Sequence, residues 1–183
     1  MLITGFGGTD RSLEPLRRVL RHLGHDARAV GLGRMDDDVE ANFPQVGRRS
    51  ERLAEETGRP VALIGWSIGG VLAREAARDH AASVRRVITF GTPIEGGPGY
   101  TALAGRYSDE RLRAIRALIE ERHETPITVP VTAIRSHNDG VVSTEACVDR
   151  RTPGAENIEV SGTHLGMSLD PDVWSVIAER LAS

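Results

Sequence analysis

Residues 61–75, VALIGWSIGGVLARE, join an apolar run to a run of helical periodicity through a serine that lies between two glycines, residues 65 and 69. The unbroken apolar run 61–66 is typical of a strand that is buried on both faces of a parallel sheet. The run 68–80 predicts a helix. Strand, tight turn and helix in this order form the repeating unit of a parallel sheet covered by helices, so the stretch predicts an α/β fold.

The rest of the chain alternates in the same way. Strands are predicted at residues 2–4, 61–66, 84–90, 127–134 and 157–160, with a weaker one at 26–32. Helices are predicted at residues 12–23, 45–57, 68–80, 109–123 and 172–181. We therefore expect one domain, 1–183, built as a three-layer sandwich: a mostly parallel sheet of about six strands with helices on both faces.

Composition excludes several classes of protein. The chain has 183 residues and a formal net charge of -3, which gives no basic field for nucleic acid. It contains no lysine, which excludes Schiff-base chemistry. The single cysteine, Cys147, is expected to be a small buried side chain. No apolar run predicts membrane insertion and no signal peptide is evident, so a cytoplasmic protein is expected. A strand that starts at residue 2 is also compatible with a longer chain preceding Met1.

The serine at the turn, Ser67, lies in a Gly-x-Ser-x-Gly motif formed by residues 65–69. Between a strand and a helix, this motif is typical of a nucleophile held on a strained turn. The hydroxyl would then project at the helix N-terminus. There the N–H of Ile68 and the helix dipole can stabilise an oxyanion. An ordinary helix N-cap is the alternative interpretation of this serine.

A serine nucleophile needs a base and an acid that orients it. His164, in the loop SGTHLGM after the last strand, has the position expected of the base in the chain order Ser, Asp, His. Asp139, in SHNDGVV after the strand 127–134, is the preferred acid, although Asp-Gly is also an ordinary turn sequence. Asp149 and Glu145 are alternatives farther from the strand end. Of the other histidines, His22, His25 and His80 are interpreted as solvated, and His123 as favoured by its charge at a helix C-terminus. His137 is expected at the same edge of the sheet, but it precedes Asp139 by only two residues.

The loop TGFGGTD after the first strand is expected to supply the second oxyanion donor, the N–H of Phe6. Its glycines allow the backbone to approach a substrate closely. A phosphate-binding turn is the alternative, but the loop lacks the G-x-G-x-x-G spacing. The acidic run 35–38, MDDD, is interpreted as a solvated loop. No metal and no organic cofactor is expected.

With GWSIGG, SHNDGVV and SGTHLGM in this order, the chain resembles the α/β-hydrolase superfamily, and within it the small bacterial esterases and lipases. GFGG stands where these lipases carry a His-Gly-x-Gly oxyanion loop, with Thr4 in place of the histidine. The resemblance implies a reduced α/β-hydrolase fold and hydrolysis of carboxylic esters through an acyl-enzyme. Acyl transfer or thioester cleavage would use the same residues, and a non-catalytic binding protein of this fold is a further alternative.

The glycine- and proline-rich segment 92–106 is expected to form a rim loop that walls the acyl pocket and could act as a lid. The one-sided helix 109–123 is interpreted as a crossover that covers the sheet. Aromatic residues make up only 4% of the chain, which favours a soluble ester of modest chain length as the substrate over emulsified fat. The oligomeric state stays open.

Overall fold

The computed structural model describes residues 1–183 and contains one parallel sheet of five strands in the order β1-β2-β3-β4-β5. The strands are β1 (Leu2–Ile3), β2 (Val61–Trp66), β3 (Val84–Phe90), β4 (Val131–Ser136) and β5 (Glu156–Val160). Each strand pairs with the next one along the chain, so all carboxyl ends lie at one edge of the sheet. The predicted α/β class and the parallel sheet are confirmed.

The weak strand predicted at 26–32 is reduced to an isolated bridge between Leu2 and Ala29. The N–H of Leu2 donates to the carbonyl of Arg28 at 2.8 Å, and the N–H of Val30 donates to the carbonyl of Leu2 at 2.9 Å. Although β1 is very short, both of its edges are therefore hydrogen-bonded, one to this bridge and the other to β2. Five strands and one bridge take the place of the six strands that the sequence predicts.

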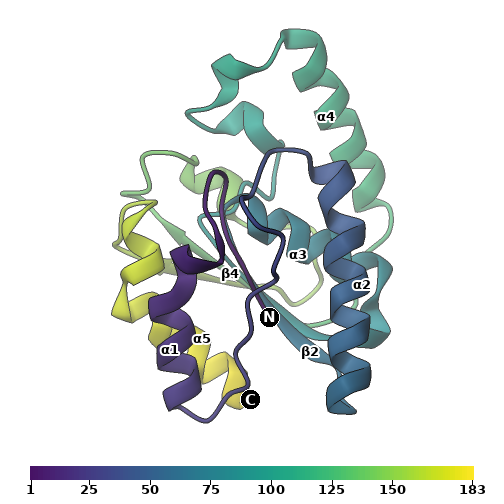
Figure 1. Ribbon diagram of the computed structural model, residues 1–183. Coiled ribbons are helices and arrows are strands. Elements are labelled where there is room, and N and C mark those ends of the chain that lie inside the picture. Colours follow the sequence, from purple (N-terminus) through teal and green to yellow (C-terminus); the bar gives the residue numbers. More distant parts are fainter.

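The helices are α1 (Glu14–His22), α2 (Val39–Thr57), α3 (Ile68–Asp79), α4 (Asp109–His123) and α5 (Pro171–Ala182). Figure 1 shows α1 and α5 together on one side of the sheet and α2 with α3 on the other. Two apolar clusters fill the two faces, because neighbouring strand residues point to opposite sides. Leu63 packs with the α2 and α3 side, whereas Ile64 packs with the α1 and α5 side. None of the helices combines the length and the apolar character that crossing a membrane requires.

Helix α2 begins at Val39 rather than at residue 45 as predicted. Pro44 lies inside its second turn, where it removes one backbone hydrogen bond but does not end the helix. The helix is capped by Asp38, whose side chain accepts a hydrogen bond from the N–H of Ala41 at 3.0 Å. One residue of the acidic run 35–38 thus has a structural role. The helix ends at Thr57, and the next residue, Gly58, adopts the left-handed conformation with φ of 67°.

Candidate active site

Ser67 forms the sharp turn between β2 and α3. With φ of 56° and ψ of −126°, it is the only non-glycine residue in the structure with a positive φ. Such a conformation costs about 1–3 kcal/mol and persists only where the surroundings impose it. Here the N–H of Ser67 donates to the carbonyl of Phe90 at 2.9 Å, at the end of β3. The hydroxyl makes no capping hydrogen bond, so a helix cap does not account for this serine.

The two glycines of the motif are required by close packing. A Cβ on Gly65 would lie 2.4 Å from the carbonyl oxygen of Gly69, and a Cβ on Gly69 would lie 2.3 Å from the carbonyl oxygen of Ile3. Strand β2, helix α3 and strand β1 therefore approach one another too closely for any side chain at these positions. The spacing Gly-x-Ser-x-Gly follows from this packing and fixes where the turn can place Ser67.

His164 and Asp139, predicted as base and acid, form a buried pair. Nδ1 of His164 lies 2.8 Å from Oδ2 of Asp139, and the N–H of His164 also donates to the carbonyl of Asp139 at 2.9 Å. Their exposed fractions are 5% and 4%, so water does not compete for the contact. The other carboxylate oxygen, Oδ1, accepts hydrogen bonds from the N–H groups of Val141 at 2.9 Å and Val142 at 2.5 Å. The carboxylate is thus held on both oxygens, with Oδ2 directed at the imidazole.

The alternative acids have other partners. Asp149 forms an ion pair with Arg74, with 2.6 Å between Oδ2 and Nη1. Glu145 forms an ion pair with Arg150 at the surface. Neither contacts His164.

The serine loop and the histidine loop meet at the ends of β2 and β3. Nε1 of Trp66 donates to the carbonyl of His164 at 3.2 Å, and the two rings have centroids 5.6 Å apart. Gly91, directly after β3, has φ of 56°, and a Cβ there would lie 3.0 Å from Nδ1 of His164. In the sequence, the only signal for Gly91 is its place directly after a predicted strand, 84–90. No hydrogen bond joins the hydroxyl of Ser67 to His164 in this structure.

The two predicted oxyanion donors are free to bind a ligand. The N–H of Phe6 donates no hydrogen bond within the chain. Ile68 is the first residue of α3, where an N–H has no acceptor within the helix. Gly5 brings the first loop against the serine, because a Cβ at Gly5 would lie 3.1 Å from Cβ of Ser67. Phe6, Ser67 and Ile68 all line one cavity.

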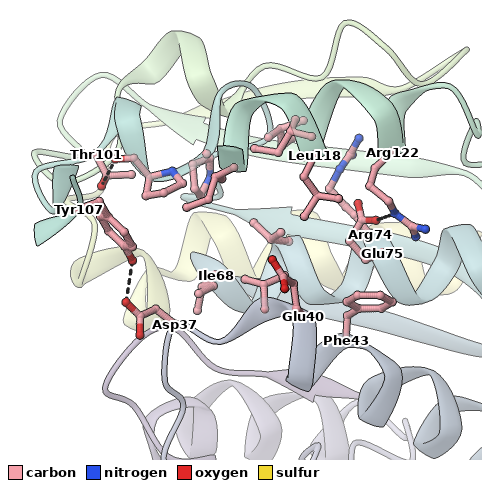
Figure 2. A pocket seen from close by; sticks show the side chains of 18 of the residues that line it. Asp37, Glu40, Phe43, Ile68, Arg74, Glu75, Thr101, Tyr107, Leu118 and Arg122 are labelled. Atoms are coloured by element: carbon pink, nitrogen blue, oxygen red, sulfur yellow. Dashed lines mark hydrogen bonds and ion pairs between the residues drawn. The ribbon is translucent and has the colours of Figure 1, made fainter. Parts of the chain in front are cut away.

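This cavity has a volume of about 590 Å³ and lies between α3 and α4 (Figure 2). Its apolar lining comes from the first turns of α2 and α3, from α4 and from the segment between β3 and α4: Val39, Phe43, Ile68, Val71, Ile94, Leu103, Ile115, Leu118 and Ile119. His164 and Asp139 do not line it, so Ser67 is the only one of the three that the cavity exposes to a ligand. The volume falls within the range of about 300–1,000 Å³ found for small-molecule sites.

Helix α4 does not cover the sheet, which corrects the prediction for residues 109–123. None of its residues is buried, and Figure 1 shows it at the top of the view, beyond α3. Its apolar side faces the cavity instead. The segment 92–106 contributes further wall residues, among them Pro93 and Leu103, and it is joined to the chain after β4 by a bridge between Thr101 and Val142.

The structure also bears on two other titratable side chains, His123 and Cys147. Burial lowers the pKa of His123, so the charged form is disfavoured and attraction to the helix dipole does not explain this residue. Cys147 is buried as predicted, and burial raises the pKa of its thiol to about 12. The thiol therefore stays protonated and has no role as a nucleophile.

One group of side chains has the composition of a metal site. Ligand atoms of Glu95, Glu120 and His123 lie within 4.8 Å of one another. Arg151 already forms ion pairs with both carboxylates, at 3.6 Å to Glu95 and 3.1 Å to Glu120. The arginine therefore supplies the positive charge that these acids require.

Comparison with known proteins identifies the fold. No protein-family model matches the chain. No curated protein matches its sequence significantly.

Among solved structures, the lipase BlEst2 of Bacillus licheniformis has a TM-score of 0.70 at 17% identity, covering 98% of this chain and 89% of that one. Est1E of Butyrivibrio proteoclasticus has a TM-score of 0.67 at 15% identity, covering 100% and 87%. The monoacylglycerol lipase of Paleococcus ferrophilus has a TM-score of 0.63 at 16% identity, covering 98% and 90%. The chain has the α/β-hydrolase fold, as its resemblance to that superfamily implied.

Proposed function

We propose that this chain is a serine hydrolase that cleaves carboxylic esters through an acyl-enzyme, with Ser67 as its nucleophile. One observation carries the proposal. A serine held in a strained turn lines an apolar cavity, and the loops after β4 and β5, which lie beside that turn, carry a buried imidazole–carboxylate pair. A strained residue at a cavity and a base oriented by an acid are the features by which nucleophilic catalysis is recognised.

In the first half of the reaction, Oγ of Ser67 attacks the ester carbonyl and Nε2 of His164 takes the hydroxyl proton. Asp139 accepts the hydrogen bond of Nδ1–H, which leaves Nε2 free to act as the base and stabilises the imidazolium. The N–H groups of Phe6 and Ile68 stabilise the negative charge that develops on the carbonyl oxygen. His164 then returns the proton to the departing alcohol, and the acyl group stays on Ser67.

In the second half, water takes the place of the alcohol. His164 removes its proton, the resulting hydroxide adds to the acyl carbonyl, and the carboxylic acid leaves as Oγ of Ser67 regains its proton. The absent hydrogen bond between Ser67 and His164 must form before the first step. Catalytic hydrogen bonds of this kind are often loose without substrate and tighten in the complex.

The comparisons support a hydrolase at the level of the fold. BlEst2 is described as a lipase, and the Paleococcus ferrophilus protein as a monoacylglycerol lipase. At 14–17% identity these similarities extend to the fold alone. The support for the proposed reaction therefore comes from the residues of this chain.

The test is the hydrolysis of p-nitrophenyl butyrate by wild type, Ser67→Ala and the control Ser175→Ala. Ser175 is an exposed serine of α5 whose hydroxyl bonds only to the carbonyl of Pro171. We expect Ser67→Ala to lose about 10⁴-fold or more in kcat and the control to keep its activity. In parallel, a fluorophosphonate probe should add one label to wild type, located at Ser67 by mass spectrometry.

Retained turnover in a folded Ser67→Ala protein would reject the proposal. A folded wild type that neither turns over esters nor takes up the probe would instead favour a binding protein of this fold. Product analysis with added alcohols and with thioesters separates hydrolysis from acyl transfer and thioester cleavage, which use the same residues.

A further inference from the structure

Trp66, the second residue of the Gly-x-Ser-x-Gly motif, ends β2 and directly precedes Ser67. Its side chain is 7% exposed and belongs to the apolar cluster on the α1 and α5 side of the sheet. The indole ring is stacked on the ring of Phe90 at the end of β3, with 6.4 Å between the centroids and 10° between the planes. Trp66 does not line the cavity, so contact with a substrate held there does not explain it.

The indole ring contacts the loop after β1, which carries Phe6. A Cβ on Gly5 would lie 3.2 Å from Cε3 of Trp66 and 3.1 Å from Cβ of Ser67. The backbone of this loop therefore lies against both residues, and the ring limits how closely the N–H of Phe6 approaches Ser67. A smaller side chain at position 66 would leave space beside Gly5, into which the loop could move.

The indole N–H holds the loop that carries His164. Nε1 of Trp66 donates to the carbonyl of His164 at 3.2 Å, a buried hydrogen bond between residues 98 positions apart. The N–H of His164 donates in turn to the carbonyl of Asp139 at 2.9 Å. Both backbone polar groups of the base are thus bonded, one to the end of β2 and the other to the loop after β4. Without the indole donor, the buried carbonyl would lose its partner.

One side chain therefore joins the three loops that the proposed mechanism uses. The peptide bond links Trp66 to Ser67, its ring lies against Gly5, and its N–H binds the backbone of His164. Burial and stacking on Phe90 hold the ring itself in place. Because a misplacement of about 1 Å in a reacting group can lower the rate about 10²-fold, a small shift of this ring is expected to affect catalysis.

Resting on the proposed ester hydrolysis, we propose that Trp66 is a positioning residue. Its Nε1–H sets the place of His164 relative to Ser67, and its ring sets the place of the loop after β1. Trp66 takes no part in the chemical steps and acts through the residues that do. This assigns a role to the variable position that precedes the serine in the motif.

The chain offers a matched control for removing the donor. Its other tryptophan, Trp174 in α5, makes a hydrogen bond of the same kind, because its Nε1 donates to the carbonyl of Ser168 at 3.2 Å. We expect Trp66→Phe to lower kcat for p-nitrophenyl butyrate about 10- to 100-fold. The KM should change less than about twofold, because Trp66 does not line the cavity. Trp174→Phe should keep both wild-type values.

The leaving group separates positioning of the base from a general loss of structure. p-Nitrophenolate leaves readily without a proton, whereas the alkoxide of ethyl butyrate requires the proton that His164 returns to it. In Trp66→Phe we expect kcat/KM to fall about tenfold further for ethyl butyrate, followed by titration of the acid, than for p-nitrophenyl butyrate. A preparation that contains fewer folded molecules would lose both activities by the same factor.

The hydrogen bond is isolated with 3-benzothienylalanine, an analogue of tryptophan in which sulfur replaces the N–H group. Incorporated into Trp174→Phe, it replaces Trp66 alone and keeps a ring of the same shape beside Gly5 and Phe90. We expect kcat/KM for ethyl butyrate to fall about tenfold, the effect of one hydrogen bond, and that for p-nitrophenyl butyrate to fall less. Circular dichroism and thermal unfolding verify the fold, and the analogue decides the question where Trp66→Phe does not fold.

The outcomes separate the two proposals. If wild type hydrolyses neither ester, the proposed function fails. If wild type is active and the folded analogue protein keeps its kcat/KM for both esters, the positioning role of Trp66 is wrong. Equal losses on the two esters, or equal losses in Trp66→Phe and Trp174→Phe, would also overturn it, because the loss would then not arise from displacement of His164.

Discussion

Arg74 and Asp149 form an ion pair that the fold encloses almost completely. The distance between Nη1 and Oδ2 is 2.6 Å, and the exposed fractions of the two side chains are 4% and 0%. Oδ1 of Asp149 also accepts hydrogen bonds from the N–H groups of Arg151 at 3.0 Å and Thr152 at 2.9 Å. The pair therefore ties α3, which carries Ser67 at its start, to the loop between β4 and β5.

Replacing this carboxylate should destabilise the protein. In Asp149→Asn the guanidinium of Arg74 stays buried without its counter-charge, which costs about 3–5 kcal/mol of unfolding free energy. Urea unfolding measures the loss. The control Glu145→Gln removes an ion pair with Arg150 at the surface and should cost less than about 1 kcal/mol. Equal, small losses in both variants would show that the buried pair does not stabilise the fold.

The same pair should make stability depend on pH in the acid range. Burial alone would raise the pKa of Asp149, but the charge of Arg74 and the hydrogen bonds from Arg74 and Thr152 outweigh it and hold this pKa below its ordinary value. In the unfolded chain the carboxyl titrates near pH 3.9. A lowered folded pKa contributes stability that is fully present above the unfolded value and is lost as the pH falls through the folded value.

The difference in unfolding free energy between wild type and Asp149→Asn should therefore be constant from about pH 5 to 7 and should become smaller below about pH 4. Urea unfolding at intervals between these values measures it. A gap that stays the same down to the acid limit of folding would mean that Asp149 does not titrate with a lowered pKa.

The positions of the catalytic candidates could be predicted because a parallel sheet gathers its strand ends at one edge. Because VALIGW predicts a buried strand of such a sheet, the loops that carry Asp139 and His164 are expected beside its carboxyl end, although they are distant along the chain. The predicted contact between these two side chains is present.

The environment of the cavity could not be predicted in the same way. A one-sided helix shows that α4 faces something apolar, but periodicity does not say whether that is the sheet or a cavity. Likewise, the burial of Arg74 depends on its ion pair with Asp149, far away in the chain, and the local sequence contains no sign of that partner. Helix α2 extends past Pro44 because its first turns tolerate one missing hydrogen bond.

Gly91 should be intolerant of any side chain. Its φ of 56° disfavours other residues, and a Cβ would lie 3.0 Å from Nδ1 of His164 and 3.1 Å from Oδ2 of Asp139. Gly91→Ala should displace the imidazole and lower kcat for p-nitrophenyl butyrate more than about tenfold, because small misplacements of catalytic groups are costly. Gly105→Ala is the matched control, since a Cβ there meets nothing within 4 Å. Full activity in a folded Gly91→Ala protein would mean that the pair tolerates displacement or is not used.

Asp139→Asn separates the geometry of the pair from its charge. The amide oxygen of asparagine can still accept the hydrogen bonds from Val141 and Val142, so the loop keeps its shape. The amide nitrogen then faces Nδ1 of His164, and because it is a donor, the ring must carry its proton on Nε2. In that tautomer Nε2 cannot take the proton of Ser67. We expect kcat on p-nitrophenyl butyrate to fall about 10³- to 10⁴-fold, and fluorophosphonate labelling to slow in parallel. Glu145→Gln should leave both rates unchanged, because Glu145 does not contact His164. A folded Asp139→Asn protein that retains more than a tenth of the wild-type kcat would remove Asp139 from the mechanism.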